Sequence, residues 1–196
     1  MEAERPHLIV LAGPNGAGKT TAAPALLAGT LGVTEFVNAD VIARGLSAFR
    51  PEGAAISAGR VMRERLHQLA AQRVNFAFET TLASRSFAPW ISSLCGSGYA
   101  FHLVFLWLPS AEVAVERVRD RVRQGGHDVP AETVRRRYRA GLRNFSQLYR
   151  PLAEAWRFYD NSDRSGPRLL AAGNRNTVET VADPETWNRI TEGLGQ

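Results

Sequence analysis

The chain has 196 residues, of which 44% are hydrophobic and 22% are charged, values that are ordinary for a globular protein of one domain. No apolar run approaches the roughly 20 residues of a membrane span, and the charged start of the chain lacks the apolar stretch of a signal peptide. Cys95 is the only cysteine, which excludes an internal disulfide. We therefore expect a single domain over residues 1–196, cytoplasmic and without membrane association.

The formal net charge of +5 is concentrated in one stretch of the chain. Between Arg117 and Arg150 there are ten arginines against Asp120, Asp128 and Glu132. Such a local excess favours a site for a polyanion, which is either the phosphates of a nucleotide or a nucleic acid. A solvated helix face is the alternative for any single arginine.

Short apolar runs that end at glycine, proline or polar residues predict buried strands. Such runs occupy residues 7–11, 35–38, 75–78, 101–108 and 157–159. The run at 101–108 is nearly continuous, which is typical of a central strand in a parallel sheet that is covered on both faces.

Helical patterns separate these strands. We expect helices at residues 19–28, 52–71, 87–94, 111–124 and 131–154, with Ser110 as the cap of the fourth. The last forty residues predict a small hairpin and a short helix from Pro184. Strands that alternate with helices indicate an α/β fold with a mostly parallel sheet of about five strands, in which ligands bind beyond the carboxyl ends of the strands.

The loop after the first strand matches the Walker A pattern completely, between a strand and a helix. Its glycines let successive N–H groups face phosphate oxygens, and the following helix adds its positive end. We expect Lys19 to reach the β- and γ-phosphates of ATP and the Thr20 hydroxyl to bind Mg²⁺. Lys19 is also the only lysine among 24 basic residues, at a position that favours a compact ammonium. The predicted nucleotide-binding residues are Gly13, Pro14, Asn15, Gly16, Ala17, Gly18, Lys19, Thr20 and Thr21.

The Walker A motif predicts the fold of a P-loop NTPase with three α/β/α layers. Two carboxylates follow other strands of the predicted sheet. Asp40 comes after the second strand, where a carboxylate can hold an acceptor hydroxyl and take its proton, or cap a helix that starts at Val41. Glu79 ends the third strand in the Walker B arrangement and is predicted to hold Mg²⁺ or to bind a substrate hydroxyl. Thr80 and Thr81 are predicted to bind substrate beside it, and a surface role for Glu79 is the alternative.

The arginine-rich stretch is expected to form a helical lid over about residues 117–138, in which a glycine loop joins two helices. Arginines on such a lid stabilise the charge that builds up during phosphoryl transfer. The candidates are Arg121 together with Arg136 or Arg137. His127 in the loop is a weaker candidate, since a lone loop histidine is more often structural.

Taken together, the chain resembles the zeta-toxin family of P-loop kinases. The matching segments lie at residues 13–21, 38–40, 78–84, 125–130 with 136–138, and 159–162. Well-understood members phosphorylate the 3′-hydroxyl of UDP-N-acetylglucosamine and are opposed by an antitoxin protein. The resemblance implies that Asp40 is the base, that Glu79 contacts the sugar and that the lid arginines hold phosphates. This chain is shorter than many of those toxins, and its Gly-Gly-His lid resembles a compact zeta-like branch described as predicted ATPases.

Three functions are consistent with these motifs. The leading hypothesis is an ATP- and Mg²⁺-dependent kinase that phosphorylates a hydroxyl of a UDP-sugar or a related small molecule. A nucleotide or nucleic-acid end kinase is the first alternative, although Tyr138 and Tyr149 are too sparse to stack the bases of a strand. A nucleotide-binding regulatory module with little turnover is the second, and Asp40 has no evident use in it.

Overall fold

The structure is a computed structural model that describes residues 5–27, 32–47, 51–126, 128–163 and 165–194. His127, the loop histidine considered above, and Ala28, the expected end of the first helix, lie outside these ranges. Among the described helices, none combines the length and the apolar character that crossing a membrane requires.

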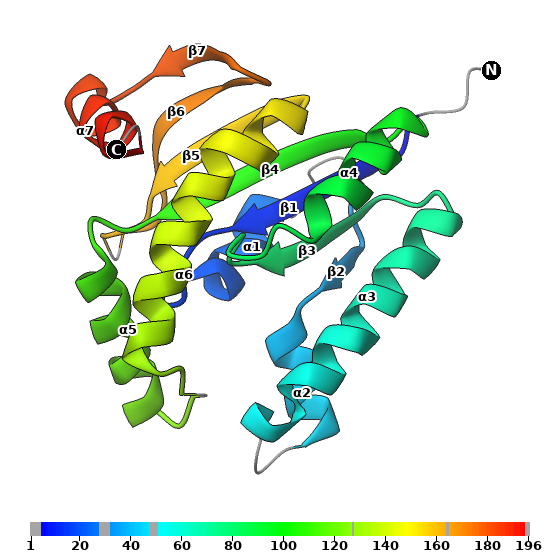
Figure 1. Cartoon of the computed structure of the whole chain (residues 1–196), viewed down its shortest axis with the longest axis horizontal. Coiled ribbons are helices and arrows are strands. Elements are labelled where there is room, and N and C mark those ends of the chain that lie inside the picture. The colour runs from blue at the N-terminus through cyan, green and yellow to red at the C-terminus, as the bar shows by residue number, and fades with distance from the viewer. Residues whose placement is uncertain (1–4, 28–31, 48–50, 127, 164, 195–196) are drawn as a thin grey trace.

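Seven strands form one sheet in the order β2-β3-β1-β4-β5-β6-β7 (Figure 1). The strands are β1 (His7–Ala12), β2 (Glu35–Val37), β3 (Phe76–Thr80), β4 (Ala100–Trp107), β5 (Ala155–Asp160), β6 (Arg168–Asn174) and β7 (Thr177–Val181). The first five pair in parallel, whereas β6 and β7 are antiparallel. The mostly parallel sheet is confirmed, and it exceeds the expected five strands because the C-terminal hairpin pairs with β5.

Helices connect the strands. The α-helices are α1 (Lys19–Leu27), α2 (Ala39–Leu46), α3 (Ala55–Ala71), α4 (Phe87–Gly96), α5 (Ala111–Arg123), α6 (Ala131–Asn144) and α7 (Pro184–Leu194). The helix predicted at 52–71 opens with a 3₁₀ turn over Pro51–Ala54. The helix predicted at 131–154 ends ten residues early, at Asn144, and is followed by a π turn at Phe145–Tyr149 and a 3₁₀ turn at Arg150–Leu152. The chain leaves α-helical geometry at the π turn, and Pro151, which has no N–H, could not have continued an α-helix to residue 154.

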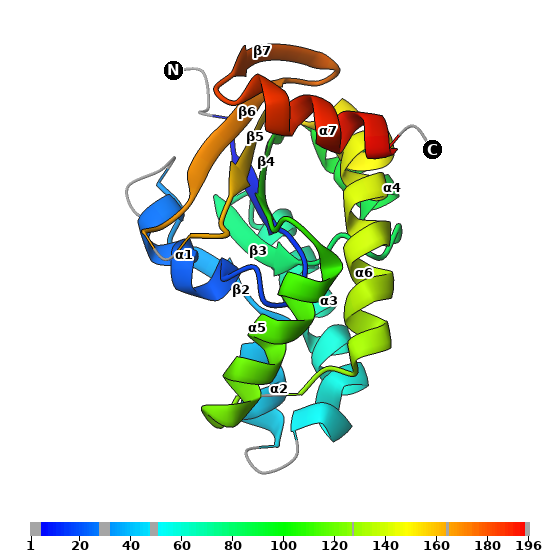
Figure 2. The ribbon, with the colours of Figure 1, turned by 90° about the vertical axis from the view of Figure 1, so that its left-hand side faces the viewer.

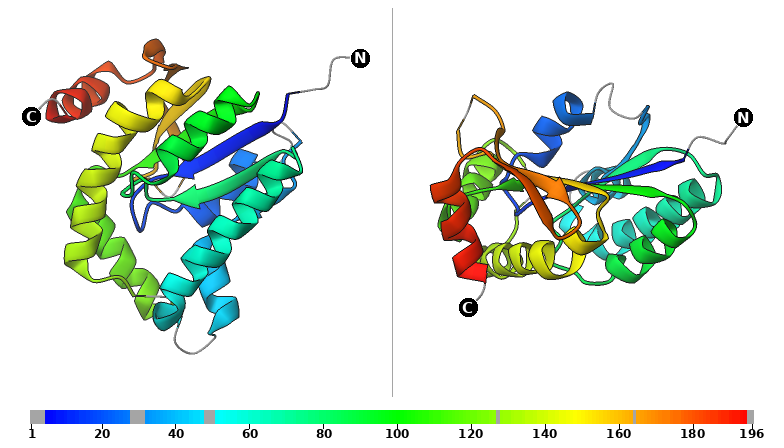
Figure 3. Two further views of the ribbon diagram at one scale, coloured as in Figure 1. Left: turned by 45° about the vertical axis from the view of Figure 1, so that its right-hand side comes forward. Right: turned by 90° about the horizontal axis from the view of Figure 1, so that it is seen from above.

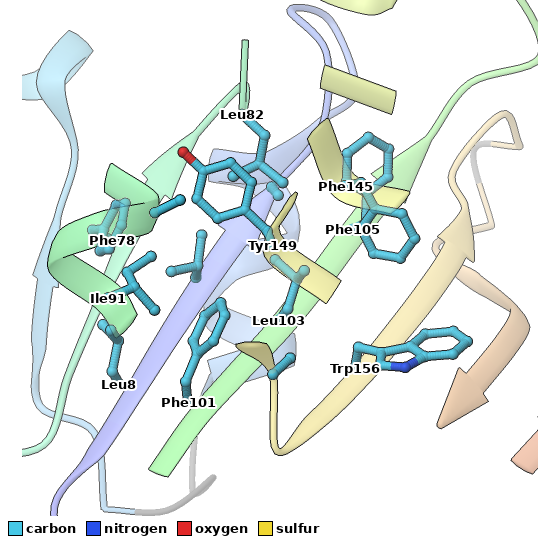
Figure 4. Close-up of a cluster of buried hydrophobic side chains, with 14 of the residues drawn as sticks. Leu8, Phe78, Leu82, Ile91, Phe101, Leu103, Phe105, Phe145, Tyr149 and Trp156 are labelled. Atoms are coloured by element: carbon cyan, nitrogen blue, oxygen red, sulfur yellow. The ribbon is translucent and has the colours of Figure 1, made fainter. Parts of the chain in front are cut away.

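Helices cover both faces of the sheet, as the side and top views show (Figures 2 and 3). Alternate residues of β1 face opposite sides, as the pleat requires. Ile9 and Leu11 belong to one buried cluster with side chains of α1 and α5, while Leu8 and Val10 belong to the other, with side chains of α3 and α4. On the second face an aromatic cluster closes the core (Figure 4), and within it the rings of Phe105 and Phe158 stack 5.0 Å apart. The three-layer α/β/α fold is therefore confirmed.

The order of the strands determines where a ligand site can form. In the sheet, strand β1 lies between β3 and β4. The chain therefore passes from one side of β1 to the other on its way from β3 to β4. In parallel register, Leu11 pairs with Glu79 and Ala12 pairs with Thr80. The loop after β1 therefore lies beside the polar end of β3, at the switch point where open α/β sheets bind ligands.

Candidate active site

The loop between β1 and α1 depends on its glycines. Gly13, Gly16 and Gly18 have φ angles of +142°, +80° and +74°, which side chains rarely tolerate. A Cβ on Gly13 would lie 2.3 Å from the carbonyl oxygen of Leu106, and one on Gly18 would lie 2.8 Å from the Asn161 amide nitrogen. The loop is thus packed too tightly against its neighbours for any side chain at these positions.

Two residues from the other half of the chain hold this loop in place. The Asn161 Nδ2 donates a hydrogen bond to the carbonyl oxygen of Ala17 at 2.7 Å. Arg117 donates in turn to the Asn161 carbonyl at 2.8 Å and to the Ser162 carbonyl. Asn161 also borders a cavity of about 580 Å³ that Arg121 lines. Asn161, directly after β5, therefore links the end of that strand to the phosphate loop.

Lys19 is enclosed by the loop that precedes it. Its side chain is only 6% exposed, and its ammonium donates to the carbonyl oxygens of Gly13 and Pro14 at 2.9 Å each. Burial lowers the pKa of Lys19, although Glu79, 3.6 Å from the ammonium, and Asp40 both act to raise it. A buried ammonium beside a loop of inward-facing backbone N–H groups fits a site for an anionic ligand such as a triphosphate.

A carboxylate, a hydroxyl and an amide meet beside this ammonium. The Glu79 Oε2 accepts hydrogen bonds from the Thr20 hydroxyl at 2.8 Å and from the Asn38 amide at 2.7 Å. Across the described residues, no three His, Cys, Asp or Glu side chains gather as a metal cage would require. Mg²⁺ is typically held by one or two carboxylates together with phosphates and water. Glu79 and Thr20 fit that arrangement, in which phosphates and water supply the remaining Mg²⁺ ligands.

Asp40 lies in the first turn of α2, and the alternative that it caps this helix is wrong. The cap is Asn38, whose backbone is extended and whose Oδ1 accepts hydrogen bonds from the N–H groups of Asp40 and Val41. The helix therefore begins at Ala39, two residues earlier than predicted. Because Asn38 already satisfies these N–H groups, the Asp40 carboxylate is left to line the neighbouring cavity.

This cavity has a volume of about 500 Å³ and brings together residues from six helices and strands, α1, α2, α3, β3, α4 and α6. The predicted residues that line it are Lys19, Asp40, Glu79, Thr80, Thr81 and Arg137. Thr80 and Thr81 accept hydrogen bonds from the N–H groups of Leu82 and Ala83, which fixes their hydroxyl oxygens at the wall. The cavity is therefore polar where it meets the phosphate loop.

The three arginine candidates lie in different environments. Arg137 on α6 donates to the Asn15 Oδ1 at 3.3 Å and lines the cavity with Asp40. Burial lowers the pKa of Arg137, whereas the Asp40 carboxylate acts to raise it. Arg121 on α5 borders the second cavity, next to Gly18, and Arg136 is exposed outside the walls of both cavities.

Sequence reasoning missed several residues of the site. Asn38 was noted only as part of a motif, and its position directly before a helix was the signal for a capping role. Met62 and Arg63 on α3 and Phe87 at the start of α4 line the far wall of the cavity. Nothing in the local sequence distinguishes the two apolar residues from core residues, so only the packing of α3 and α4 identifies them.

A glycine-rich phosphate loop after the central strand, with a carboxylate at the end of the neighbouring strand, defines a P-loop kinase-like domain with the P-loop NTPase fold. Comparison with known families assigns the chain to one family within this class. Residues 8–148 match the model of the AAA domain family, and the chain belongs to that family.

The chain is also similar to individual proteins. It is 29% identical over 131 residues to an uncharacterized protein of Haemophilus influenzae, a match that covers 66% of this chain and 91% of the relative. The structure resembles the AvrRxo1-ORF1:AvrRxo1-ORF2 complex with a TM-score of 0.74 in its sulphate form and 0.71 in its ATP form, at 18% identity. These matches cover 95% of this chain, which spans only 64% of the AvrRxo1 chain. The PezAT chromosomal toxin-antitoxin system of Streptococcus pneumoniae matches with a TM-score of 0.64 and 15% identity, over 100% of this chain and 86% of that one. At such identities the likeness establishes the fold.

Proposed function

We propose that this protein is an ATP-dependent phosphotransferase, a zeta-toxin-like kinase that transfers the γ-phosphate to a hydroxyl of a small substrate. The acceptor we propose is a UDP-sugar such as UDP-N-acetylglucosamine. The observation that carries the proposal is the shared cavity, in which the Asp40 and Glu79 carboxylates lie with Lys19 and Arg137 beside the phosphate loop. A module that only binds nucleotide has no use for a carboxylate opposite the phosphates.

In the proposed reaction, the loop from Gly13 to Thr20 binds the triphosphate through its backbone N–H groups. Asp40 takes the proton of the acceptor hydroxyl, whose oxygen then bonds to the γ-phosphorus as the bond to the leaving ADP oxygen breaks. Lys19 and Arg137 stabilise the charge on the transferred group. Thr20 and Glu79 would hold Mg²⁺, which supplies charge neutralisation at the phosphates when it is bound.

The remaining candidate residues take supporting roles in this proposal. Thr80 and Thr81 orient the acceptor at the end of β3, and Glu79 contacts it as well as the metal. Arg121 approaches the nucleotide phosphates from α5, and Arg136, exposed on α6, is the alternative to Arg137. This chain shares its fold with AvrRxo1-ORF1:-ORF2, which has a crystal structure with ATP. That likeness supports ATP as the nucleotide in this proposal.

The substitution Asp40→Asn tests the proposed base. It removes the proton acceptor and keeps the size of the side chain, so we expect transfer to fall by roughly 100- to 10,000-fold. ATP affinity should stay within about twofold, since the substitution leaves the phosphate loop intact. Transfer of ³²P from ATP and calorimetric titration with Mg-ATP measure the two quantities. Equal transfer by the variant and the wild type would rule out Asp40 as the base.

The acceptor is tested with a panel of UDP-sugars, nucleosides and 5′-hydroxyl RNA ends, incubated with labelled ATP. We expect label on a UDP-sugar. Label on RNA ends alone would replace the sugar nucleotide with the end-kinase alternative, and ATP binding without label on any compound would favour a regulatory module.

We also propose an antitoxin protein as a partner. The supporting observation is the shared fold with PezAT, which is a toxin-antitoxin system. Expression of the wild-type chain in a bacterial host should then arrest growth, and the Asp40→Asn variant should not. Normal growth with active wild-type protein would count against an antitoxin.

A further inference from the structure

Asn38 connects the two carboxylates of the proposed active site. It lies between β2 and α2 and is 5% exposed. Its Nδ2 donates to the Glu79 Oε2 at 2.7 Å and to the Thr20 Oγ1 at 3.3 Å. Its Oδ1 accepts from the N–H of Asp40 at 2.7 Å and from the N–H of Val41 at 3.2 Å.

These four hydrogen bonds use the whole capacity of the side chain. An asparagine amide has two N–H donors and one oxygen with two lone pairs, and each of them has a partner here. An aspartate at this position would offer no donor to Glu79, and a serine would be too short to bridge the two groups. The position therefore specifies an amide, which a capping role alone does not require, since Asp and Ser cap helices as well as Asn does.

We propose that Asn38 is a positioning residue that holds the Asp40 carboxylate at a fixed place relative to Glu79 and Thr20. This inference rests on the proposed function, in which Asp40 is the base and the Glu79–Thr20 pair serves the phosphate side. The acceptor end of Asn38 fixes the start of α2, and so the backbone of Asp40. The donor end fixes that same side chain to the end of β3. A reacting hydroxyl misplaced by about 1 Å costs roughly 100-fold in rate, so this link sets the efficiency of transfer.

The variant Asn38→Ser separates the two halves of the side chain. Serine retains the cap and introduces no charge, but it removes both donors to Glu79 and Thr20. We expect kcat for transfer to fall by roughly 100-fold, while the Kd for Mg-ATP remains close to wild type. The midpoint of urea unfolding should fall, because the Glu79 carboxylate loses a hydrogen bond, with the protein still folded under the assay conditions. The matched control is Asn174→Ser in β6. It removes a hydrogen bond of the same length, 2.7 Å, from the side-chain amide to Glu179, far from the cavity. The control should leave kcat unchanged.

A double substitution tests whether Asn38 acts through Asp40. If it does, adding Asn38→Ser to Asp40→Asn should lower kcat little further, because the group that it positions has already lost its function. A full additional loss of about 100-fold, or an Asn38→Ser variant as fast as the Asn174→Ser control, would overturn the proposal.

A crystal structure of Asn38→Ser gives a readout that needs no turnover. The proposal requires the Asp40 carboxylate to move relative to Glu79 by about 1 Å or more. Unchanged carboxylate positions overturn it, even in a protein that transfers no phosphate. Absence of transfer by the wild type would instead count against the proposed function, so the two failures remain distinguishable.

Discussion

At the scale of single residues, Lys19 is the side chain on which the proposed ATP site depends most directly. Its buried ammonium fills the space between two carbonyl oxygens of the loop, and a planar guanidinium is wider and differently shaped. We therefore expect Lys19→Arg to weaken Mg-ATP binding about as much as Lys19→Ala does. The expected loss is roughly 10- to 100-fold, because hydrogen bonds to charged groups contribute about 1.5–3 kcal/mol.

Calorimetric titration with Mg-ATP measures this loss. The conservative control is Arg123→Lys, an exposed position on α5 whose guanidinium pairs with Asp120, and it should bind ATP like the wild type. If Lys19→Arg retained the wild-type affinity, the shape argument for the lone lysine would be wrong.

The contrast between Lys19 and Arg137 shows which residues a sequence can identify. The phosphate loop is contiguous, and its function follows from local backbone geometry, so its pattern predicts the position of Lys19 directly. Arg136 and Arg137 are adjacent, and only the rotation of α6 about its axis decides which of them faces the cavity. Like Arg137, Asn38 could not be identified from the local sequence, because its importance depends on Glu79, which is distant in sequence.

At the scale of elements, the end of α6 holds the segment that follows β3. The Asn144 amide donates to the Leu82 carbonyl at 2.7 Å, and the Tyr149 hydroxyl donates to the Ser84 carbonyl at 2.6 Å. Leu82 has a φ of +54° although it is not a glycine, a conformation that persists only where its surroundings enforce it. The π turn that brings Tyr149 to Ser84 depends on these long-range contacts, so a helical pattern at 131–154 could not reveal it.

The variant Gly141→Ala tests this contact between elements. A Cβ on Gly141 would lie 2.4 Å from the carbonyl oxygen of Thr81, so either α6 or the segment after β3 must shift. We expect a loss of stability, because overpacking costs about 1–3 kcal/mol and outweighs the helix-propensity gain of about 0.5–1 kcal/mol. The shift should also raise the KM for the acceptor, since Thr81 lines the cavity.

Urea unfolding and acceptor kinetics measure these two effects. The matched control is Gly45→Ala in α2, where a Cβ would meet nothing within 4 Å. That control should be neutral or slightly stabilising. Equal stability of the two variants would mean that α6 does not constrain Thr81.

At the scale of the whole molecule, the sheet has two ends with different chemistry. The polar groups discussed above follow the carboxyl ends of β1, β2 and β3. At the opposite end, the Nδ1 of His7 on β1 lies 3.0 Å from the Nε2 of His102 on β4. Parallel pairing of β1 with β4 places His102 opposite Ile9, two residues along β1 from His7, so the two side chains lie near each other. The two histidines are 95 positions apart, and no local pattern in the sequence connects them.

His102 predicts a dependence of stability on pH. Burial is the main cause that lowers the pKa of His102, and His7, Arg157 and Arg5 add to it, whereas Glu154 opposes it. The unfolded chain therefore binds the proton of His102 more readily than the folded chain does. The stability that neutral His102 contributes is complete above the unfolded pKa of about 6.5 and is lost as the pH falls through the lower folded value.

Urea unfolding between pH 5 and 8 tests this expectation. The free energy of unfolding of the wild type should fall below pH 6.5, with at most about 1.4 kcal/mol per pH unit from this one group. The variant His102→Gln should reduce that slope, because it removes the titrating ring. The control His67→Gln changes an exposed histidine on α3 that contacts Trp90, and it should leave the slope near that of the wild type. If His102→Gln kept the full slope, the acid sensitivity would arise elsewhere, and the side-chain contact of His7 with His102 would contribute nothing to it.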